Sequence, residues 1–242
     1  MLDAIKLSNL KFTWPGNNGF TLGIDNWQVS QGQKVFLYGP SGSGKSTLLN
    51  LISAVNKADS GTIEILGEDL SALSSSQRDR FRANNIGMIF QQFNLLPYLS
   101  AKQNIELGQY FGANKKVGTP DKIKEKSATI IDELADRLSI TQEMLQQKAS
   151  RLSVGQQQRV AAARALVNQP RLIIADEPTS ALDTALRDAF IELLLSNTQS
   201  ATVIFVSHDQ SLAKSFDQQF DIQSLQENCT NSKAKEGVID AA

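Results

Sequence analysis

A glycine-rich loop at residues 39–46, which reads Gly-Pro-Ser-Gly-Ser-Gly-Lys-Ser, constrains the fold more than any other feature of the sequence. The loop matches the pattern G-x-x-x-x-G-K-[ST] in full. An apolar stretch at residues 34–38 precedes it and predicts a strand, whereas residues 47–55 follow it with helical character. Both flanks fit a phosphate-binding loop between a strand and a helix; a chance turn rich in glycine and serine is the alternative.

The residue types in this loop suit the phosphates of a nucleotide. Glycines let backbone N–H groups converge on phosphate oxygens, and the N-terminus of the following helix adds positive potential. Lys45 supplies a mobile charge to the outer phosphates, and the hydroxyl of Ser46 is a ligand for Mg²⁺. The expected nucleotide-binding residues of this segment are Gly39, Pro40, Ser41, Gly42, Ser43, Gly44, Lys45, Ser46 and Thr47.

Two acidic residues follow a short, fully apolar run at residues 172–175, and a second such run lies at residues 202–206. Runs of this kind predict buried strands of a parallel sheet, whose carboxyl ends are where ligands bind. Asp176 is expected to hold Mg²⁺ there. Glu177, on the other side of an extended chain, is expected to face the γ-phosphate and orient the attacking water. A solvated acidic pair at a strand end is the alternative.

The rest of the chain divides into segments with different periodicities. Apolar and polar residues alternate within the first 30 residues, which predicts antiparallel strands around a turn at 15–19. Further strands are expected at residues 62–66 and 86–90. From residue 94 to 151 apolar residues recur at helical spacing, with an exposed loop expected at 112–120. Residues 223–242 are polar, which predicts a flexible tail.

Composition excludes several classes of protein. The formal net charge is −1, so no basic field favours nucleic acid, and no apolar run reaches the roughly 20 residues that cross a bilayer. The start lacks the basic and apolar regions of a secretion signal, and the single cysteine, Cys229, cannot form an internal disulfide. We therefore expect a soluble, cytosolic protein that reaches a membrane only through partners.

Residues 152–156 read Leu-Ser-Val-Gly-Gln and precede the acidic strand end by about 20 residues. This run resembles the signature of ATP-binding cassette (ABC) ATPases, and the resemblance covers about residues 3–222 as a single nucleotide-binding domain. It implies an α/β fold: a P-loop NTPase core with a mostly parallel sheet, an N-terminal antiparallel β subdomain and a helical subdomain inserted at about residues 94–160. In that family the signature touches an ATP held by another copy. The resemblance therefore implies a homodimer of cassettes that hydrolyses ATP with Mg²⁺.

The same resemblance implies roles for individual residues. Trp14 matches the aromatic residue that stacks on adenine, and Gln91 matches the glutamine that reaches Mg²⁺ and signals to a membrane partner. Asp183 matches the loop that contacts the other copy. His208, the only histidine of the chain, matches the residue that contacts the γ-phosphate. Catalytic roles are implied for Glu177, His208, Lys45 and Gln91, metal ligation for Ser46, Gln91 and Asp176, and ATP contact across the pair for Ser153, Val154, Gly155 and Gln156.

The signature departs from the family's usual LSGGQ, because Val154 replaces the first glycine. A β-branched valine is costly if this position needs a positive φ, but it is tolerable in the first turn of a helix. We favour the second interpretation, because Ser153 and Gly155 still supply the hydroxyl and the bare backbone. The valine affects the expected contact between the two copies and the turnover rate, but not the resemblance to the family.

Residues 86–97 are similar to the corresponding stretch of cassettes from lipoprotein-releasing and macrolide-export systems. This similarity implies integral membrane permease partners with large periplasmic domains, powered for export or mechanotransmission. It also implies a place on the cytoplasmic face of the inner membrane. A cell-division cassette of the same subgroup stays open as an alternative, as does a soluble ABC ATPase without a transport role. No nucleic acid partner is expected, and nothing in the sequence indicates the substrate.

Overall fold

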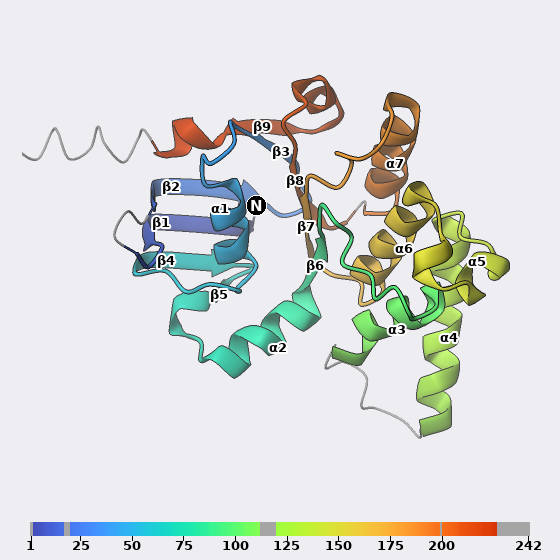
Figure 1. Cartoon of the computed structure of the whole chain (residues 1–242). Helices are drawn as coiled ribbons and strands as arrows, with labels where there is room; N and C mark the ends of the chain where they lie inside the picture. Colours follow the sequence, from blue (N-terminus) through green and yellow to red (C-terminus); the bar gives the residue numbers. More distant parts are fainter. Residues whose placement is uncertain (1, 17–19, 112–119, 199, 227–242) are drawn as a thin grey trace, which may run out of the picture.

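The computed structural model describes residues 2–16, 20–111, 120–198 and 200–226, which form two β-sheets with helices around them (Figure 1). The smaller sheet is antiparallel, with its strands in the order β2-β1-β4-β5. These strands are β1 (Asp3–Thr13), β2 (Thr21–Ser30), β4 (Ser60–Ile65) and β5 (Glu68–Asp69). The predicted N-terminal antiparallel sheet is thereby confirmed, although residues 17–19 of its first turn lie outside the described residues.

The larger sheet has its strands in the order β6-β7-β8-β3-β9, and every neighbouring pair runs parallel. Its strands are β3 (Lys34–Tyr38), β6 (Ile86–Ile89), β7 (Leu172–Asp176), β8 (Thr202–Val206) and β9 (Gln218–Asp221). The first four confirm the strands that apolar runs predict. β9 was not predicted, because its sequence Gln-Gln-Phe-Asp is polar and it lies at the edge of the sheet.

Helices cover this sheet, and most of the described stretch between β6 and β7 is helical, although residues 90–100 form turns. The α-helices are α1 (Lys45–Ile52), α2 (Ser75–Asn85), α3 (Ala101–Phe111), α4 (Pro120–Arg137), α5 (Gln142–Gln146), α6 (Val154–Leu166) and α7 (Thr184–Ser196). Short 3-10 turns are η1 (Leu70–Ala72), η3 (Ala149–Arg151) and η4 (Gln210–Ser215). The expected loop at 112–120 falls almost wholly on residues outside the description. Among the described residues, no helix combines the length and the apolar character that crossing a membrane requires.

The parallel sheet carries a hydrophobic core on each face, because successive residues of a strand point to opposite sides. In β7, Ile173 and Ala175 pack with the helices that follow β6 in sequence, whereas Leu172 and Ile174 pack with α1 and the antiparallel sheet. β3 and β8 alternate in the same way. Figure 1 accordingly shows the antiparallel sheet and helices α3–α7 on opposite sides of the parallel sheet. With both faces covered, the strand ends are the places left for a ligand.

The folded core extends beyond the point where the sequence predicts a tail. Residues 222–226 form a helical turn in which Ile222 and Leu225 are buried in the core on the antiparallel side. Gln226 Nε2 donates a hydrogen bond to the carbonyl of Ser43 at 2.7 Å. The start of the predicted tail at residue 223 is therefore corrected, because two apolar residues spaced three apart are enough to dock one turn. Residues 227–242 lie outside the described residues.

Candidate nucleotide site

The phosphate loop connects the carboxyl end of β3 to the first turn of α1. Gly44 has a φ of 94°, and a Cβ atom there would lie 2.8 Å from the ring of Phe20, so only glycine fits. Lys45 Nζ donates to the carbonyls of Gly39 at 2.8 Å and Pro40 at 2.9 Å. These contacts hold the ammonium at the mouth of the loop, beside the free N–H groups at the start of α1. The loop therefore gathers the positive charge that a phosphate needs.

Asp176 lies across from the loop at the carboxyl end of β7. Its Oδ2 accepts a hydrogen bond from Ser46 Oγ at 3.4 Å. Burial, and then the neighbouring charge of Glu177, raise the pKa of Asp176 above its ordinary value, although Ser46 and Lys45 act in the opposite direction. Two hard oxygen ligands and an excess of negative charge thus meet at one point, which suits a divalent cation.

Glu177 corrects one detail of the sequence interpretation, which expects an extended chain here. The backbone is left-handed, with a φ of 44°. Its N–H donates to the carbonyl of Val206 at 3.0 Å, and its carbonyl accepts from Ser180 N at 3.3 Å, so the chain turns at this residue. A left-handed backbone at a residue other than glycine costs roughly 1–3 kcal/mol and concentrates at functional sites. The turn, rather than strand alternation, sets the direction of the carboxylate.

His208 lies beside this carboxylate. It follows β8 by two residues, and its Nδ1 is 3.5 Å from Glu177 Oε2. The imidazole is 67% exposed, so it faces the outside of the strand edge rather than the core. The structure thus brings an acid and a histidine together with the phosphate loop at the carboxyl ends of β3, β7 and β8.

Two aromatic residues flank the loop. Trp14 is 41% exposed, and its Nε1 donates to Thr47 Oγ1 in α1 at 3.0 Å. Phe12 meets the indole edge-on, with ring centroids 5.3 Å apart. Phe20, which covers Gly44 and is 36% exposed, was missed by sequence reasoning, because its alternation with Leu22 and Ile24 places it simply in a strand. The pair of aromatic surfaces gives the loop an apolar wall.

Gln91 lies apart from these contacts, exposed in the turn after β6. Arg164 of α6 fixes this turn by donating to the carbonyls of Phe93 and Asn94, each at 2.6 Å. Burial lowers the pKa of Arg164 below its ordinary value. Within the described residues no hydrogen bond joins the Gln91 side chain to Ser46 or Asp176, and its role near a metal stays a prediction.

The signature residues form the first turn of α6. Ser153 caps the helix, and Ser153 and Gln156 satisfy each other's backbone N–H groups at 3.3 and 2.8 Å in a capping box. Val154 is the first helical residue and is 46% exposed, so the structure supports the interpretation that valine is tolerable here. A Cβ atom on Gly155 would meet nothing within 4 Å. The turn therefore presents an open helix N-terminus.

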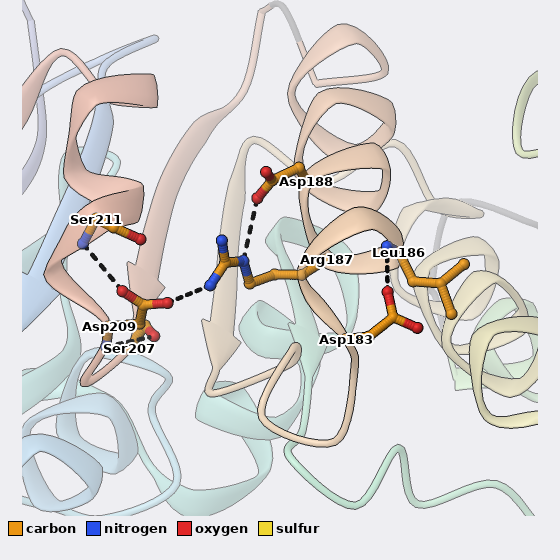
Figure 2. Close-up of polar contacts among 7 residues, drawn as sticks. All are labelled: Asp183, Leu186, Arg187, Asp188, Ser207, Asp209 and Ser211. Carbon is orange, nitrogen blue, oxygen red and sulfur yellow. Dashed lines mark hydrogen bonds and ion pairs between the residues drawn. The ribbon is translucent and has the colours of Figure 1, made fainter.

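The loop after Glu177 connects the acid pair to two helices. Asp183 caps α7, because its Oδ1 accepts from Leu186 N at 2.9 Å (Figure 2). Gln158 of α6, which is 1% exposed, donates to the carbonyl of Pro178 at 2.8 Å. Sequence reasoning missed Gln158, whose only signal is a place on the same helix face as Ala161 and Ala162. This bond fixes the signature helix to the segment that follows the acid pair.

The described residues contain no group of three or more histidine, cysteine, aspartate or glutamate side chains that could hold a metal by themselves. A metal at this site would therefore depend on Ser46, Asp176 and oxygen atoms of a ligand.

Comparison with known proteins gives one consistent family. The family model described as "ABC transporter" matches residues 22–180. The ATP-binding protein YknY of Bacillus subtilis, an uncharacterized ABC transporter component, is 39% identical over 215 residues, which are 86% of this chain and 88% of that protein. The lipoprotein-releasing system ATP-binding protein LolD 1 of Rhodopseudomonas palustris is 36% identical over 223 residues, with 90% and 95% covered. The solved dimer of the ATP-binding cassette MJ0796 in a post-hydrolysis state, bound to ADP and Pi, matches with a TM-score of 0.75 and 34% identity, covering 90% of this chain and 93% of that chain.

Proposed function

This chain belongs to the ABC transporter family, and we propose that it is an ATP-hydrolysing cassette that acts as a pair and drives a membrane complex. The observation that carries the proposal is the meeting of Lys45, Ser46, Asp176, Glu177 and His208 at the carboxyl edge of one parallel sheet. No other described part of the chain combines a phosphate loop with a carboxylate and a histidine.

The phosphates of the nucleotide bind in the phosphate loop, and its base stacks on Trp14. The backbone N–H groups of residues 39–47 and the ammonium of Lys45 hold the phosphates. Trp14 offers a half-exposed indole whose edge is fixed by Thr47 and Phe12, so its orientation is set before adenine stacks on it. The fixed indole reduces the entropy that base binding costs.

Ser46 and Asp176 would hold Mg²⁺, with Gln91 as a further ligand. The close approach of Ser46 Oγ to Asp176 Oδ2, at 3.4 Å, and the raised pKa of Asp176 both fit a cation. When bound, Mg²⁺ offsets negative charge on the phosphate oxygens. The ligands that this chain contributes are few, which is usual for a magnesium ion that also binds a nucleotide.

Hydrolysis follows from the placement of Glu177 and His208. Glu177 orients a water and accepts its proton, so that the water oxygen attacks the γ-phosphorus; the bond from that phosphorus to the β–γ bridging oxygen then breaks to give ADP and phosphate. Lys45 and His208 stabilise negative charge on the transferring group. The left-handed backbone at Glu177 fixes the carboxylate in the direction of the imidazole, which lies 3.5 Å away.

The second copy completes the site. Ser153, Val154, Gly155 and Gln156 of one copy reach the γ-phosphate of the ATP held by the other, and Asp183 lies at the contact between copies. The exposed capping box of α6 supports this arrangement, because it offers a helix N-terminus that suits an anion. The dimeric MJ0796 cassettes, at 34% and 32% identity, support pairing as well.

The cassette pair would drive separate integral membrane permeases with large periplasmic domains, for export or for mechanical work across the inner membrane. Similarity to a lipoprotein-releasing ATP-binding protein supports this partner class. The chain itself would lie on the cytoplasmic face, where ATP is supplied.

ATP turnover by the Glu177→Gln variant tests the catalytic part of the proposal. We expect kcat to fall about a hundredfold or more, because the general base is lost, while ATP binding and ATP-driven dimerisation persist. Lys45→Ala should lose ATP binding. Glu192→Gln, the same change at an exposed position of α7, is the matched control and should keep wild-type turnover. Wild-type turnover by Glu177→Gln would overturn the assignment.

A further inference from the structure

An ion pair joins the first turn of α7 to the segment that contains His208. Arg187 Nη1 donates to Asp209 Oδ2, and Arg187 Nε donates to Asp188 Oδ1 at 3.0 Å (Figure 2). The side chain of Arg187 is 17% exposed, that of Asp209 is 35% exposed, and that of Asp188 is 61% exposed. Arg187 therefore makes one shielded contact to a distant segment and one exposed contact to its own neighbour.

Asp209 is fixed on three sides. Its Oδ1 accepts from Ser211 N at 3.0 Å and caps η4, and its backbone N–H donates to Ser207 Oγ at 3.1 Å. Hydrogen bonds from Ser211, with smaller contributions from Arg187 and His208, hold the pKa of Asp209 below its ordinary value. The carboxylate is thus ionised at neutral pH. His208 lies between this residue and Ser207, which is buried, so the backbone on both sides of the imidazole is held.

Arg187 is tied just as closely to the start of α7. Its backbone N–H donates to the carbonyl of Asp183 at 2.9 Å, and the Asp183 side chain caps the same turn. Asp183 and Arg187 therefore move together as one rigid turn of helix. Beside the pair, a cavity of about 500 Å³ opens between α7 and η4. Within the described residues, Arg187–Asp209 is the ion pair that crosses from α7 to this segment.

We infer that Arg187 and Asp209 are positioning residues for His208, which transmit the seating of a second copy at Asp183 to the imidazole beside Glu177. When the loop at Asp183 contacts the second copy, the first turn of α7 moves and Arg187 moves with it. Arg187 in turn sets the position of Asp209 and of the adjoining histidine. The inference rests on the proposed function, because it requires a pair of cassettes that hydrolyse ATP. The Arg187–Asp209 ion pair would thereby couple the contact between the two copies to the γ-phosphate.

Steady-state ATP hydrolysis by variants of the full chain tests the inference. We expect Arg187→Gln and Asp209→Asn each to lower kcat about tenfold, because small displacements of a catalytic group are costly. KM for ATP should stay within about twofold, because neither residue contacts the phosphate loop. Asn at position 209 keeps the oxygen that caps η4, so that variant removes the charge and leaves the cap in place.

Three further variants separate positioning from a general loss of structure. Asp188→Asn removes the exposed partner of Arg187 and should leave kcat unchanged. Arg187→Lys should recover part of kcat, because it keeps the charge. The Arg187→Gln/Asp209→Asn double variant should be no slower than either single variant, since both act through one contact. In the Glu177→Gln background, Arg187→Gln should still dimerise with ATP, and thermal unfolding of each variant checks that it is folded.

Each outcome distinguishes this inference from the proposed function. If wild type hydrolyses ATP and Glu177→Gln does not, but Arg187→Gln and Asp209→Asn keep wild-type kcat, the inference is wrong and the proposed function stands. A loss of kcat that Asp188→Asn shares and Arg187→Lys does not relieve also overturns the inference. If wild type itself fails to hydrolyse ATP, the proposed function falls and the inference with it.

Discussion

At the scale of one residue, the partly buried carboxyl group of Asp176 lowers the stability of the folded protein at neutral pH. Its pKa is raised first by burial and then by Glu177, so the folded protein binds a proton at this carboxyl more readily than the unfolded chain does. The stability that Asp176 contributes is therefore fully present below the ordinary aspartate pKa of about 3.9 and is lost as pH rises through the raised folded value. At neutral pH the ionised carboxylate destabilises the protein when no cation is bound.

The Asp176→Asn variant should therefore unfold at a higher temperature than wild type at neutral pH without nucleotide or Mg²⁺. The difference should shrink as the pH is lowered toward the ordinary aspartate value. Stabilisation by ATP with Mg²⁺ should be lost in the same variant, because the variant lacks the proposed metal ligand. Thermal unfolding from pH 8 to pH 4.5 measures both effects, with the exposed Asp136→Asn as the control. A lower unfolding temperature for Asp176→Asn at pH 8 would contradict the stated cause.

Local structure could be predicted from the sequence where the chemistry of neighbouring residues decides it. The strand, loop and helix around Lys45 follow from the glycine pattern and its flanks, and the structure forms them in that order. The turn at Glu177 could not be predicted, because its left-handed backbone depends on a bond to Val206 in a strand nearly thirty residues away. Phe20 was not identified for a similar reason: its ring lies against Gly44 only when the segment that leads into β2 and the phosphate loop come together in the fold.

At the scale of elements, α6 joins three parts of the molecule. Its first turn carries the signature, Gln158 holds the segment after the acid pair, and Arg164 holds the turn that contains Gln91. α3 packs against α6 so closely that a Cβ atom on Gly108 would lie 2.5 Å from the carbonyl of Arg164. Helical spacing predicts that such helices exist, but it carries no information on which of them touch. The crossing of α3 and α6 was therefore beyond sequence reasoning.

Arg164→Ala should destabilise the protein by about 2–3 kcal/mol, because two carbonyls lose a charged donor. It should also speed amide exchange in residues 91–94, whose turn is no longer held. Arg159→Ala is the matched control on the same helix, since Arg159 donates one exposed hydrogen bond, to the carbonyl of Ser139 at 3.1 Å. The control should change stability by no more than about 0.5 kcal/mol. Urea unfolding and hydrogen exchange measure the two effects; equal losses for both variants would refute the special role of Arg164.

At the scale of the whole molecule, the parallel sheet separates two hydrophobic cores. The phosphate loop, Asp176, Glu177 and His208 lie at the carboxyl ends of its strands. Short apolar runs were enough to predict the strands of this sheet other than β9, because strands covered on both faces need no alternation of apolar and polar residues. The expected division into a core and an inserted helical subdomain stays a prediction. So do the roles of individual site residues, which require a nucleotide and a second copy.

If the site forms only between copies, ATP hydrolysis per molecule should rise with protein concentration and then reach a plateau, by mass action. Ser153→Arg should bind ATP like wild type but lose this rise, because the bulky cation blocks the contact across the pair. Turnover measured from nanomolar to micromolar protein decides the point. A rate per molecule that is constant over this range, together with a monomeric mass in the presence of ATP, would mean that one copy suffices.

The two tryptophans of the chain lie in opposite surroundings. Trp27 is 3% exposed and packed edge-on against Phe220, whereas Trp14 is 41% exposed beside the phosphate loop. Indole emission depends on the polarity around the ring, so a base stacked on Trp14 would change its fluorescence while that of Trp27 stayed constant. If the base stacks there as proposed, Trp14 would report on bound nucleotide and Trp27 would serve as an internal reference. In a Trp27→Phe variant, the arrival and departure of nucleotide could be followed on the millisecond scale without any added dye.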